Sequence, residues 1–291
     1  MGHLLQLAIN GLALGSVYAL IALGFVIVYT ATGVVNFAAG EFVMIGTFMA
    51  VTSIVQAGLP LPVAYVATLV GMALFGLMFY ALIFLPLQRR PVLTVIIGTV
   101  AAGIVMQNTA VLIWGTFPFR LPSPFSDKLL IIAGSVVPLH NIAILVVTAL
   151  LVVGLYFLLY RTALGSSMRA TAQDTETARL MGIPVDQILA FTWILAALLA
   201  GVAGLLLGPI WFADVNVGGA LALKAFAATI IGGFGSVPGA VLGGLFVGLT
   251  EVFGASFISS TYKDGFSFLL MLLFLLIRPQ GIFGERIAQR G

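Results

Sequence analysis

Long apolar runs separated by short polar segments dominate this chain. Runs of about 20 or more apolar residues predict membrane-spanning helices, because a helix needs about that length to cross the hydrocarbon core. The runs lack the strict alternation of apolar and polar residues that is typical of β-barrel strands. The pattern therefore predicts six spans, a glycine-rich apolar stretch and a final helix that ends near Ile277. The spans are 4–29, 36–57, 61–86, 92–115, 139–160 and 188–210, and the glycine-rich stretch is 217–257.

This pattern predicts an all-α polytopic membrane protein with a single transmembrane domain over residues 1–291 and eight or nine crossings. The two counts arise because residues 211–280 have the length of about two and a half spans, which indicates one short or broken helix. Glycine-rich breaks at 33–40 and 232–244 lie in opposite halves of the chain. Such paired breaks are typical of inverted repeats, and equally of close helix packing. The break residues are Gly33, Gly232, Gly233, Gly235 and Gly239.

Composition supports a lipid environment. Hydrophobic residues make up 62% of the chain and charged residues 7%, against about 25% charged in soluble domains. The net charge of +3 comes from basic residues scattered at loop ends, so it does not indicate a nucleic-acid partner. The chain has no cysteine and two histidines that are far apart. Disulfides and cysteine-ligated metals are thus excluded, and no metal site is expected.

The basic residues also predict orientation, because short loops rich in Lys and Arg stay in the cytoplasm. The turn after the third predicted span and the 161–187 segment agree, since two spans separate them. Both are therefore expected to be cytoplasmic, with the N-terminus outside. The basic residues after the last span favour a cytoplasmic C-terminus as well, which requires three crossings in 211–280. These residues are Arg89, Arg90, Arg161, Arg169, Arg179, Arg278, Arg286 and Arg290.

The 161–187 segment is the most polar part of the chain, with three acidic and three basic residues. Gly165 and the two following serines favour a helix start, and Gly182 with Pro184 favours its end. The segment therefore predicts one short helix of about three turns, held outside the membrane. A connector between adjacent spans needs only a few residues. This length favours a docking element, although spacing alone also allows a solvated connector.

Polar groups inside the spans are candidates for a translocation pathway. Glu41 is the single charged residue among the first 88 and follows the first glycine-rich break. A charge at the bilayer centre costs about 2.5–3.5 kcal/mol on insertion scales, so such a residue usually faces protein or water. Glu41 is expected to line a pathway or to accept from a broken helix, and a position near an interface is the alternative. The other pathway candidates are Asn36, Gly40, Gln107 and Glu251.

These further candidates have simpler interpretations. Span amides such as Asn36 and Gln107 commonly hydrogen-bond to neighbouring helices. Glu251 is consistent with a helix end near an interface. Lys224 is expected to extend its ammonium group to the membrane surface, as long basic side chains do near helix ends.

Four motifs, in order and over nearly the whole chain, resemble the permease subunits of branched-chain amino acid ABC importers, in particular the first and shorter permease of the pair. The first motif is Gly15-Ser16-Val17-Tyr18-Ala19-Leu20 with Gly33-Val34-Val35-Asn36-Phe37-Ala38-x-Gly40-Glu41, and the second is Leu87-x-Arg89-Arg90-Pro91 with Ile97-Gly98-Thr99. The third is Gly165-x3-Arg169-Ala170-x3-Asp174-x3-Ala178-x2-Met181-Gly182-Ile183. The fourth is Gly232-Gly233-x-Gly235-Ser236-x2-Gly239-Ala240 with Gly243-Gly244.

The resemblance implies a multi-pass protein of the bacterial inner membrane that forms the pore with a second, related permease. It further implies two cytoplasmic ATPases, a periplasmic substrate-binding protein, and ATP and Mg²⁺ bound by those ATPases. The 161–187 segment would be the coupling loop. Its implied coupling residues are Gly165, Arg169, Ala170, Asp174, Ala178, Met181 and Gly182.

The chain itself contains no Gly-x4-Gly-Lys-Ser/Thr motif, so it is expected to be a transport subunit without enzyme activity or a bound cofactor. Two alternatives remain open. One is a self-sufficient secondary transporter coupled through Glu41 or Glu251. The other is the same type of importer carrying urea or short amides. A membrane-embedded enzyme is disfavoured, because the spans show no nucleophile–base pair and no cluster of acidic residues and histidine.

Overall fold

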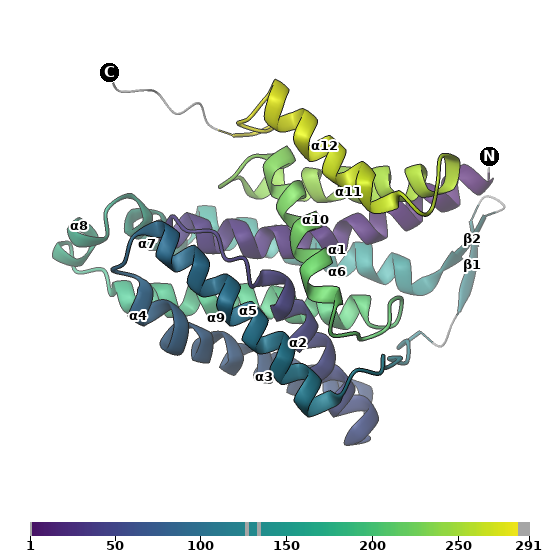
Figure 1. The fold of residues 1–291 in the computed structure, drawn as a ribbon, viewed down its shortest axis with the longest axis horizontal. Helices are drawn as coiled ribbons and strands as arrows, with labels where there is room; N and C mark the ends of the chain where they lie inside the picture. The colour runs from purple at the N-terminus through teal and green to yellow at the C-terminus, as the bar shows by residue number, and fades with distance from the viewer. Residues whose placement is uncertain (1, 126–127, 133–134, 285–291) are drawn as a thin grey trace. The chain divides into compact units, whose positions relative to one another are not determined.

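The computed structural model describes residues 2–125, 128–132 and 135–284. The apolar runs fold as helices because a helix satisfies every backbone hydrogen bond within one segment, and Figure 1 shows their order along the chain. Two π-helical segments, Thr52–Gln56 and Tyr80–Phe84, extend α2 and join α3 to α4. The helices are α1 Gly2–Thr32, α2 Ala39–Val51, α3 Leu61–Phe79, α4 Leu85–Leu87, α5 Val92–Trp114, α6 Leu139–Arg161, α7 Ala163–Gln173, α8 Thr175–Leu180, α9 Val185–Leu207, α10 Val217–Gly232, α11 Val237–Phe257 and α12 Lys263–Ile277.

Seven helical segments within the described residues are long and apolar enough to cross a membrane, which confirms the all-α polytopic fold. Residues 217–257 form two helices, α10 and α11, so this stretch does contain the expected short helix. Helix α10 has 16 residues and α12 has 15, or about 24 and 22 Å of helix, less than the roughly 30 Å of a hydrocarbon core. Arg286 and Arg290 lie outside the described residues, and the side of the C-terminus stays a prediction.

A β-hairpin lies in the loop between α5 and α6, where the sequence indicated only loop. Strand β1 (Leu129–Ile132) pairs antiparallel with β2 (Ser135–Pro138), and Leu129 lies opposite Pro138. Four-residue strands are too short for a reliable alternation pattern, which is why the sequence analysis missed them.

The chain divides into two compact units assembled from separate stretches. The first unit consists of Met1–Val26, Asp127–Val152 and Leu223–Gly291. The second consists of Ile27–Ser126 and Val153–Ala222. Helices α1, α6 and α10 each contribute residues to both units.

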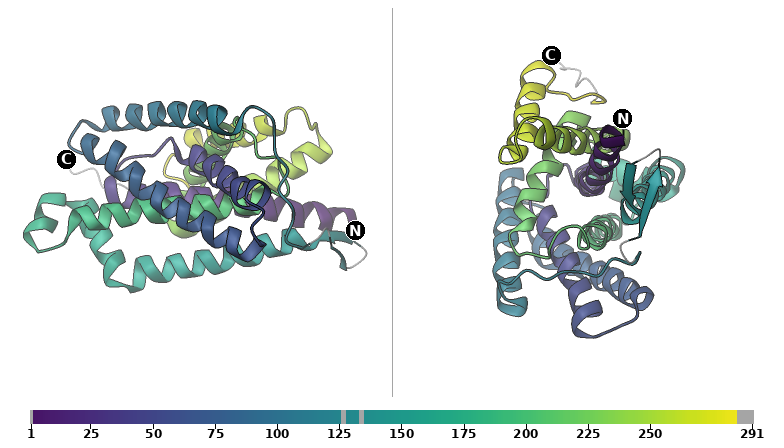
Figure 2. Two further views of the ribbon diagram at one scale, coloured as in Figure 1. Left: turned by 90° about the horizontal axis from the view of Figure 1, so that it is seen from below. Right: turned by 90° about the vertical axis from the view of Figure 1, so that its right-hand side faces the viewer.

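The core of the second unit forms where α2 packs on α9, α3 and α5 (Figures 1 and 2). Glycines allow the close approach of α2 and α9, since a Cβ on Gly46 would lie 2.9 Å from the Cα of Gly201. Aromatic rings fill the space between α2, α3 and α9. The ring centroids of Phe42 and Phe79 are 4.8 Å apart, and those of Phe79 and Trp193 are 5.0 Å apart. Each such pair adds about 0.5–1.5 kcal/mol beyond the burial of its area.

In the first unit, α1 and α11 cross through glycines spaced four residues apart on both helices. These are Gly11 and Gly15 on α1, and Gly244 and Gly248 on α11. A Cβ on Gly15 would lie 2.7 Å from the carbonyl oxygen of Gly244. Small residues at this spacing bring helix backbones into contact, which is a main source of helix association in lipid.

The predicted break glycines fall into two groups. One group lies between helices and has positive φ values: 68° at Gly33, 104° at Gly233 and 83° at Gly235. Glycine suits these positions because it adopts the left-handed backbone without steric cost. Gly232 and Gly239 lie within α10 and α11, and each leaves too little room for a Cβ beside the other's backbone. The second glycine-rich region therefore contains both a helix break and a close helix contact.

The end of α10 is covered by the chain that follows α12. The backbone N–H of Ile282 donates to the carbonyl of Ile231, and that of Phe283 donates to the carbonyl of Gly232, both at 2.9 Å. These are carbonyls of the last turn, which a helix leaves without intrahelical partners. The returning chain thus satisfies part of the α10 terminus.

Candidate functional site

One face of α5 contacts the first helix break. Thr99 and Gly103 are four residues apart, so they lie on the same side of the helix. The backbone N–H of Phe37, within the break, donates to Oγ1 of Thr99 at 3.3 Å. One turn further along α5, a Cβ on Gly103 would lie 3.4 Å from Cγ of Glu41. Helix α5 therefore positions both the break and the first turn of α2.

The same face continues to the segment that leads into α10. Gln107 lies four residues after Gly103, and its Nε2 donates to the carbonyl of Val215 at 3.2 Å and to Oδ1 of Asn216 at 3.3 Å. The break, Glu41 and the start of α10 therefore contact successive positions on one face of α5. These positions are Thr99, Gly103 and Gln107. We call this line of residues the α5 seam.

Glu41 lies in a cradle of glycines at the N-termini of two helices. It belongs to the first turn of α2, and its carboxylate packs against Gly218 in the first turn of α10. A Cβ on Gly218 would lie 2.6 Å from the carboxyl carbon of Glu41 and 2.8 Å from its Oε1. Gly40 leaves similarly little space, since its Cβ would lie 2.7 Å from the Cβ of Ala222. The cradle admits the carboxylate only because these positions carry no side chain.

The surroundings of Glu41 stabilise its carboxylate only in part. The positive ends of the α2 and α10 dipoles favour a carboxylate at this position. Yet Oε2 of Glu41 is buried, and no described residue donates a hydrogen bond to it. A buried oxygen without a donor costs about 1–3 kcal/mol, and more when charged. The site therefore favours a carboxylate while leaving one of its buried oxygens without a donor among the described residues.

The other sequence-predicted polar residues of the second unit occupy defined places. Asn36 is 2% exposed, and its Oδ1 accepts from the N–H of Ala38 at 3.1 Å, so it stabilises the turn of the break. Glu41 and Gln107 lie along the α5 seam, whereas Gly40 contacts Gly218 and Ala222 of α10. The sequence analysis missed Thr99, Gly103, Asn216 and Gly218 as members. A repeat of small or polar residues every four positions in α5 is the signal that could have indicated Thr99 and Gly103.

Glu251 belongs to a separate buried cluster in the first unit. Nζ of Lys224 lies 2.7 Å from Oε1 of Glu251 and 2.7 Å from Oδ1 of Asp264. The hydroxyl of Tyr18 donates to Oε2 of Glu251 at 2.8 Å. Glu251 lies inside α11 rather than at its end, and both of its carboxylate oxygens are engaged. The cluster therefore ties α1, α10, α11 and α12 together.

The expectation that Lys224 extends to the membrane surface is wrong. Its side chain is 2% exposed, and the buried Glu251 and the exposed Asp264 compensate its charge. A buried ammonium group of this kind remains charged only with such partners.

The polar segment between α6 and α9 forms two helices, so the expectation of one three-turn helix is wrong. Helix α7 begins at Ala163, and Thr162 caps it by accepting from the N–H of Gly165 at 3.2 Å. The helix stops at Asp174, whose φ of −157° and ψ of 105° are extended. Oδ1 of Asp174 accepts from the N–H groups of Glu176 and Thr177, both at 3.0 Å. Aspartate at an N-cap is more favourable than aspartate inside a helix, which explains the break.

Gly165 and Arg169 attach α7 to the end of α6. A Cβ on Gly165 would lie 2.5 Å from the carbonyl oxygen of Leu158. Nη1 of Arg169 donates to the carbonyl of Leu159, and its guanidinium carbon lies 5.6 Å from the ring centroid of Tyr160. These contacts tie α7 to the end of α6.

The far end of the segment presents apolar side chains outside the spans. Leu180 is 87% exposed and Met181 is 79% exposed, while Ala178 is buried. Gly182 ends the segment with a φ of 82°, and Ala170 is partly exposed on α7. We call Leu180 and Met181 the apolar tip.

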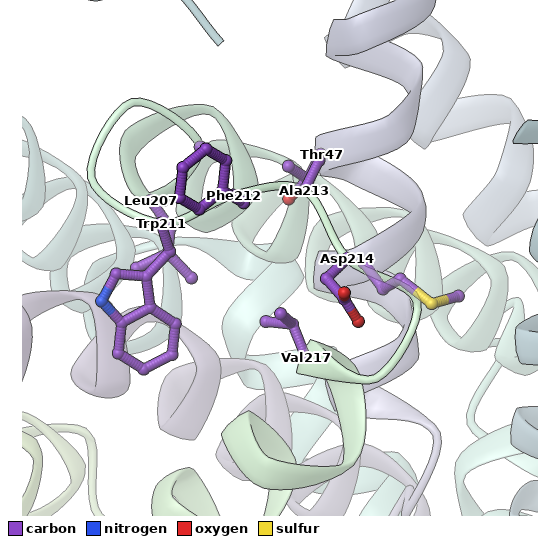
Figure 3. Close-up of a pocket in the computed structure, with 9 residues that line it drawn as sticks. Thr47, Leu207, Trp211, Phe212, Ala213, Asp214 and Val217 are labelled. Atoms are coloured by element: carbon purple, nitrogen blue, oxygen red, sulfur yellow. The ribbon is translucent and has the colours of Figure 1, made fainter. Parts of the chain in front are cut away.

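A small pocket lies in the loop between α9 and α10, beside α2. Figure 3 shows Trp211, Phe212, Ala213 and Asp214 following one another along this loop, with Thr47 on the neighbouring helix. Its volume of about 10 Å³ holds at most one water molecule, so it is too small for an amino acid. Among the described residues, no group of three or more acidic residues and histidines could hold a metal ion.

A bundle of apolar helices that buries a few charges between its helices and carries a charged segment outside them has the construction of a multi-pass membrane transport protein. Comparison with known proteins defines the family. A family model described as "Branched-chain amino acid transport system / permease component" matches residues 7–275. The chain therefore belongs to this family of ABC transport permeases.

Relatives match over almost their full length. The chain is 40% identical to the high-affinity branched-chain amino acid transport system permease protein BraD of Pseudomonas aeruginosa, covering 97% of this chain and 96% of BraD. It is 34% identical to LivH of Escherichia coli, with the same coverage. It is 32% identical to a probable LivH of Methanocaldococcus jannaschii, over 91% of this chain and 88% of that protein.

A solved structure shares the fold. A chain of PsaBC from Streptococcus pneumoniae, in complex with Fab, superimposes with a TM-score of 0.52 over 97% of this chain and 94% of that chain. The sequence identity is 13%, so this likeness concerns the fold alone.

Proposed function

We propose that this chain is a pore-forming permease subunit of a heteromeric ABC importer, which moves branched-chain amino acids across the bacterial inner membrane. The observation that carries this proposal is the end-to-end similarity to BraD and LivH, whose names state that substrate class. The partners are a second related permease, two cytoplasmic ATPases and a periplasmic binding protein. ATP and Mg²⁺ bind to the ATPases, and this chain binds no cofactor.

The segment from α7 to α8 is the proposed coupling element. Its apolar tip, Leu180 and Met181, lies outside the spans and is available to a cytoplasmic partner. Exposed apolar side chains of this kind are typical of protein interaction sites. Gly165 and Arg169 fix α7 to α6, so a force on the tip reaches a spanning helix. Asp174 sets the angle between the two halves of the element.

The two arginine-rich segments lie at the same end of the second unit. Arg89, in the turn after α4, and Arg179, in α8, line the same cavity. Basic loops on one side of a membrane indicate the cytoplasm. Residues 161–187 are therefore proposed to lie in the cytoplasm. The basic residues that follow the last helix in the sequence favour the same side for the C-terminus.

Glu41 is the proposed polar group of the translocation pathway. Its unpaired Oε2 can accept from the ammonium group of an amino acid, while the N-termini of α2 and α10 favour the carboxylate of the same molecule. Gln107 lies on the same seam, Gly40 packs on α10 beside Glu41, and Asn36 stabilises the adjoining turn. Glu251 has both oxygens engaged, so it supports a pathway role less well than Glu41.

Reconstitution of the four kinds of subunit in lipid vesicles tests the proposal. Leucine uptake should require both ATP and the binding protein. Replacing Leu180 and Met181 by serine should abolish uptake and stimulated ATP hydrolysis, while the permease still inserts. A control with Leu164→Ser changes an exposed leucine of α7 and should retain uptake. Uptake without the ATPases would instead support a secondary transporter, and preference for urea or short amides over leucine would overturn the substrate class.

A further inference from the structure

A polar cavity of about 600 Å³ lies within the second unit, at the end that carries the arginine-rich turn. Its walls come from the end of α1, the turn after α4, helix α8 and the start of α9. It is lined by Ala31, Thr32, Phe84, Gln88, Arg89, Thr175, Glu176, Arg179 and Leu189. This volume is within the range of small-molecule sites, about 300–1,000 Å³.

The charges around the cavity leave one group of each sign without a protein partner. Arg179 is paired with Asp186 at 2.9 Å. No ion pair or side-chain hydrogen bond within the described residues involves Arg89 or the carboxylate of Glu176. Arg89 comes from the turn after α4, and Glu176 from α8, so the two charges stand on different walls. This arrangement is complementary to a molecule with one anionic and one cationic group.

The inner lining of the cavity is apolar. Ala31, Phe84 and Leu189 are 1%, 4% and 4% exposed, so they form a floor within the helix bundle. Such a floor accommodates an aliphatic side chain, while Gln88, Thr32 and Thr175 add polar groups nearer the rim. A phosphate group fits less well, because Glu176 would repel it and Arg179 is already neutralised by Asp186.

We propose that this cavity binds a free zwitterionic amino acid with an aliphatic side chain, and that its occupancy slows import. The ligand's carboxylate meets Arg89, its ammonium group meets Glu176, and its side chain lies on the apolar floor. A bound molecule bridges the turn after α4 and helix α8. It thereby restrains the coupling element, whose movement import requires. This inference rests on the proposed function, because it assigns the site to the transported class on the cytoplasmic side.

Uptake into vesicles that contain ATP and graded unlabelled leucine tests the proposal. In the wild-type complex, the initial rate of labelled leucine uptake should fall as internal leucine rises. Arg89→Gln should require about tenfold more internal leucine for the same inhibition, as expected for loss of one charge-assisted hydrogen bond. Its uptake into leucine-free vesicles should equal that of the wild type. Arg90→Gln is the matched control, since this neighbouring arginine does not line the cavity, and it should keep wild-type inhibition.

Internal isoamylamine, which lacks the carboxylate, should inhibit far less than leucine in wild-type vesicles. One outcome would overturn the regulatory site and leave the proposed function intact. In that outcome, uptake into leucine-free vesicles is normal and added internal leucine does not inhibit it. Equal inhibition of wild type and Arg89→Gln would overturn the regulatory site as well.

Equilibrium dialysis of labelled leucine against the purified complex tests binding independently of transport. Arg89→Gln and Glu176→Gln should each weaken leucine binding about tenfold. The exchange variant Arg89→Glu with Glu176→Arg should restore part of it, because the cavity again offers one group of each sign. Unchanged binding in both single variants contradicts the site even if uptake itself cannot be reconstituted.

Discussion

Two carboxylates within the apolar helices of this chain have opposite surroundings. Glu251, in the first unit, has an ammonium group on one oxygen and a hydroxyl on the other, at 2.7 and 2.8 Å. Glu41, in the second unit, has glycines around it, and its Oε2 has no donor among the described residues. Both lie in apolar helices, where an uncompensated charge costs a few kcal/mol of free energy.

A rare intramembrane charge therefore does not by itself indicate a role in transport. The protein compensates the charge of Glu251 internally, so removing a partner should mainly affect folding. It leaves Glu41 incompletely paired, so removing the charge of Glu41 should mainly weaken ligand binding and transport. Stability and transport measurements can therefore separate the two carboxylates.

The largest expected effect is on the paired carboxylate. Lys224→Met leaves the buried Glu251 without its cation and removes the ion pair of the exposed Asp264, and it should cost about 3–5 kcal/mol. The midpoint of thermal unfolding in detergent measures this loss. Adding Glu251→Met to the same chain should recover much of it, because the uncompensated charge is then removed. Lys128→Met, an exposed control, should leave the midpoint unchanged, and an equally stable Lys224→Met would contradict the compensation argument.

A smaller effect is expected from filling the cradle of the unpaired carboxylate. Gly218→Ala places a methyl group 2.6 Å from the carboxyl carbon of Glu41, and overpacking of this kind costs about 1–3 kcal/mol. Gly219→Ala is the matched control, because its Cβ would meet nothing within 4 Å. The control should be neutral or slightly stabilising, since alanine favours helix. Similar unfolding midpoints for both variants would show that the cradle is not tight.

Neutralising Glu41 should affect transport much more than stability. Glu41→Gln keeps the shape of the side chain, and its cost in stability should stay below about 1 kcal/mol. Leucine uptake should fall about tenfold or more, since a charge-assisted contact with the substrate's ammonium group is lost. Normal uptake at every leucine concentration would return Glu41 to a structural role.

The smallest effect concerns a third carboxylate, which is exposed. Hydrogen bonds from Thr177 and Glu176 lower the pKa of Asp174 below its usual 3.8. A lowered pKa means that the ionised cap stabilises α8 above the unfolded value, and that this contribution is lost as pH falls through the folded value. Hydrogen exchange of residues 175–180 should therefore be constant from pH 8 to 5 after correction for the intrinsic rate. Asp174→Asn should retain protection because asparagine also caps, whereas equal protection in Asp174→Ala would remove the capping role.

The spans were predictable because bilayer thickness imposes a length that any sequence must meet. The predicted span 188–210 corresponds to Val185–Leu207, and the final helix ends at Ile277 as expected. The hairpin and the break at Asp174 were not predictable in this way. They depend on pairing and capping over a few residues, which apolar run length does not report.

The candidate site was predictable only in part. Glu41 could be singled out because it is the single charge in a long apolar stretch. Its surroundings could not, since Gly103 and Gly218 are 62 and 177 positions away in the sequence. The partners of Lys224 were missed for the same reason, because Tyr18 and Glu251 come from distant helices that only the tertiary fold brings together.

Helix α10 also sets a condition on the lipid. At about 24 Å it is several ångströms shorter than an average hydrocarbon core, and such hydrophobic mismatch is relieved by local thinning of the bilayer or by protein that covers the helix end. The returning chain at residues 281–283 supplies that cover by donating to the carbonyls of Ile231 and Gly232. A chain truncated after Ile277 would leave those carbonyls without these two donors. Residues 281–283 therefore complete the end of α10, and expression tags should be placed beyond them.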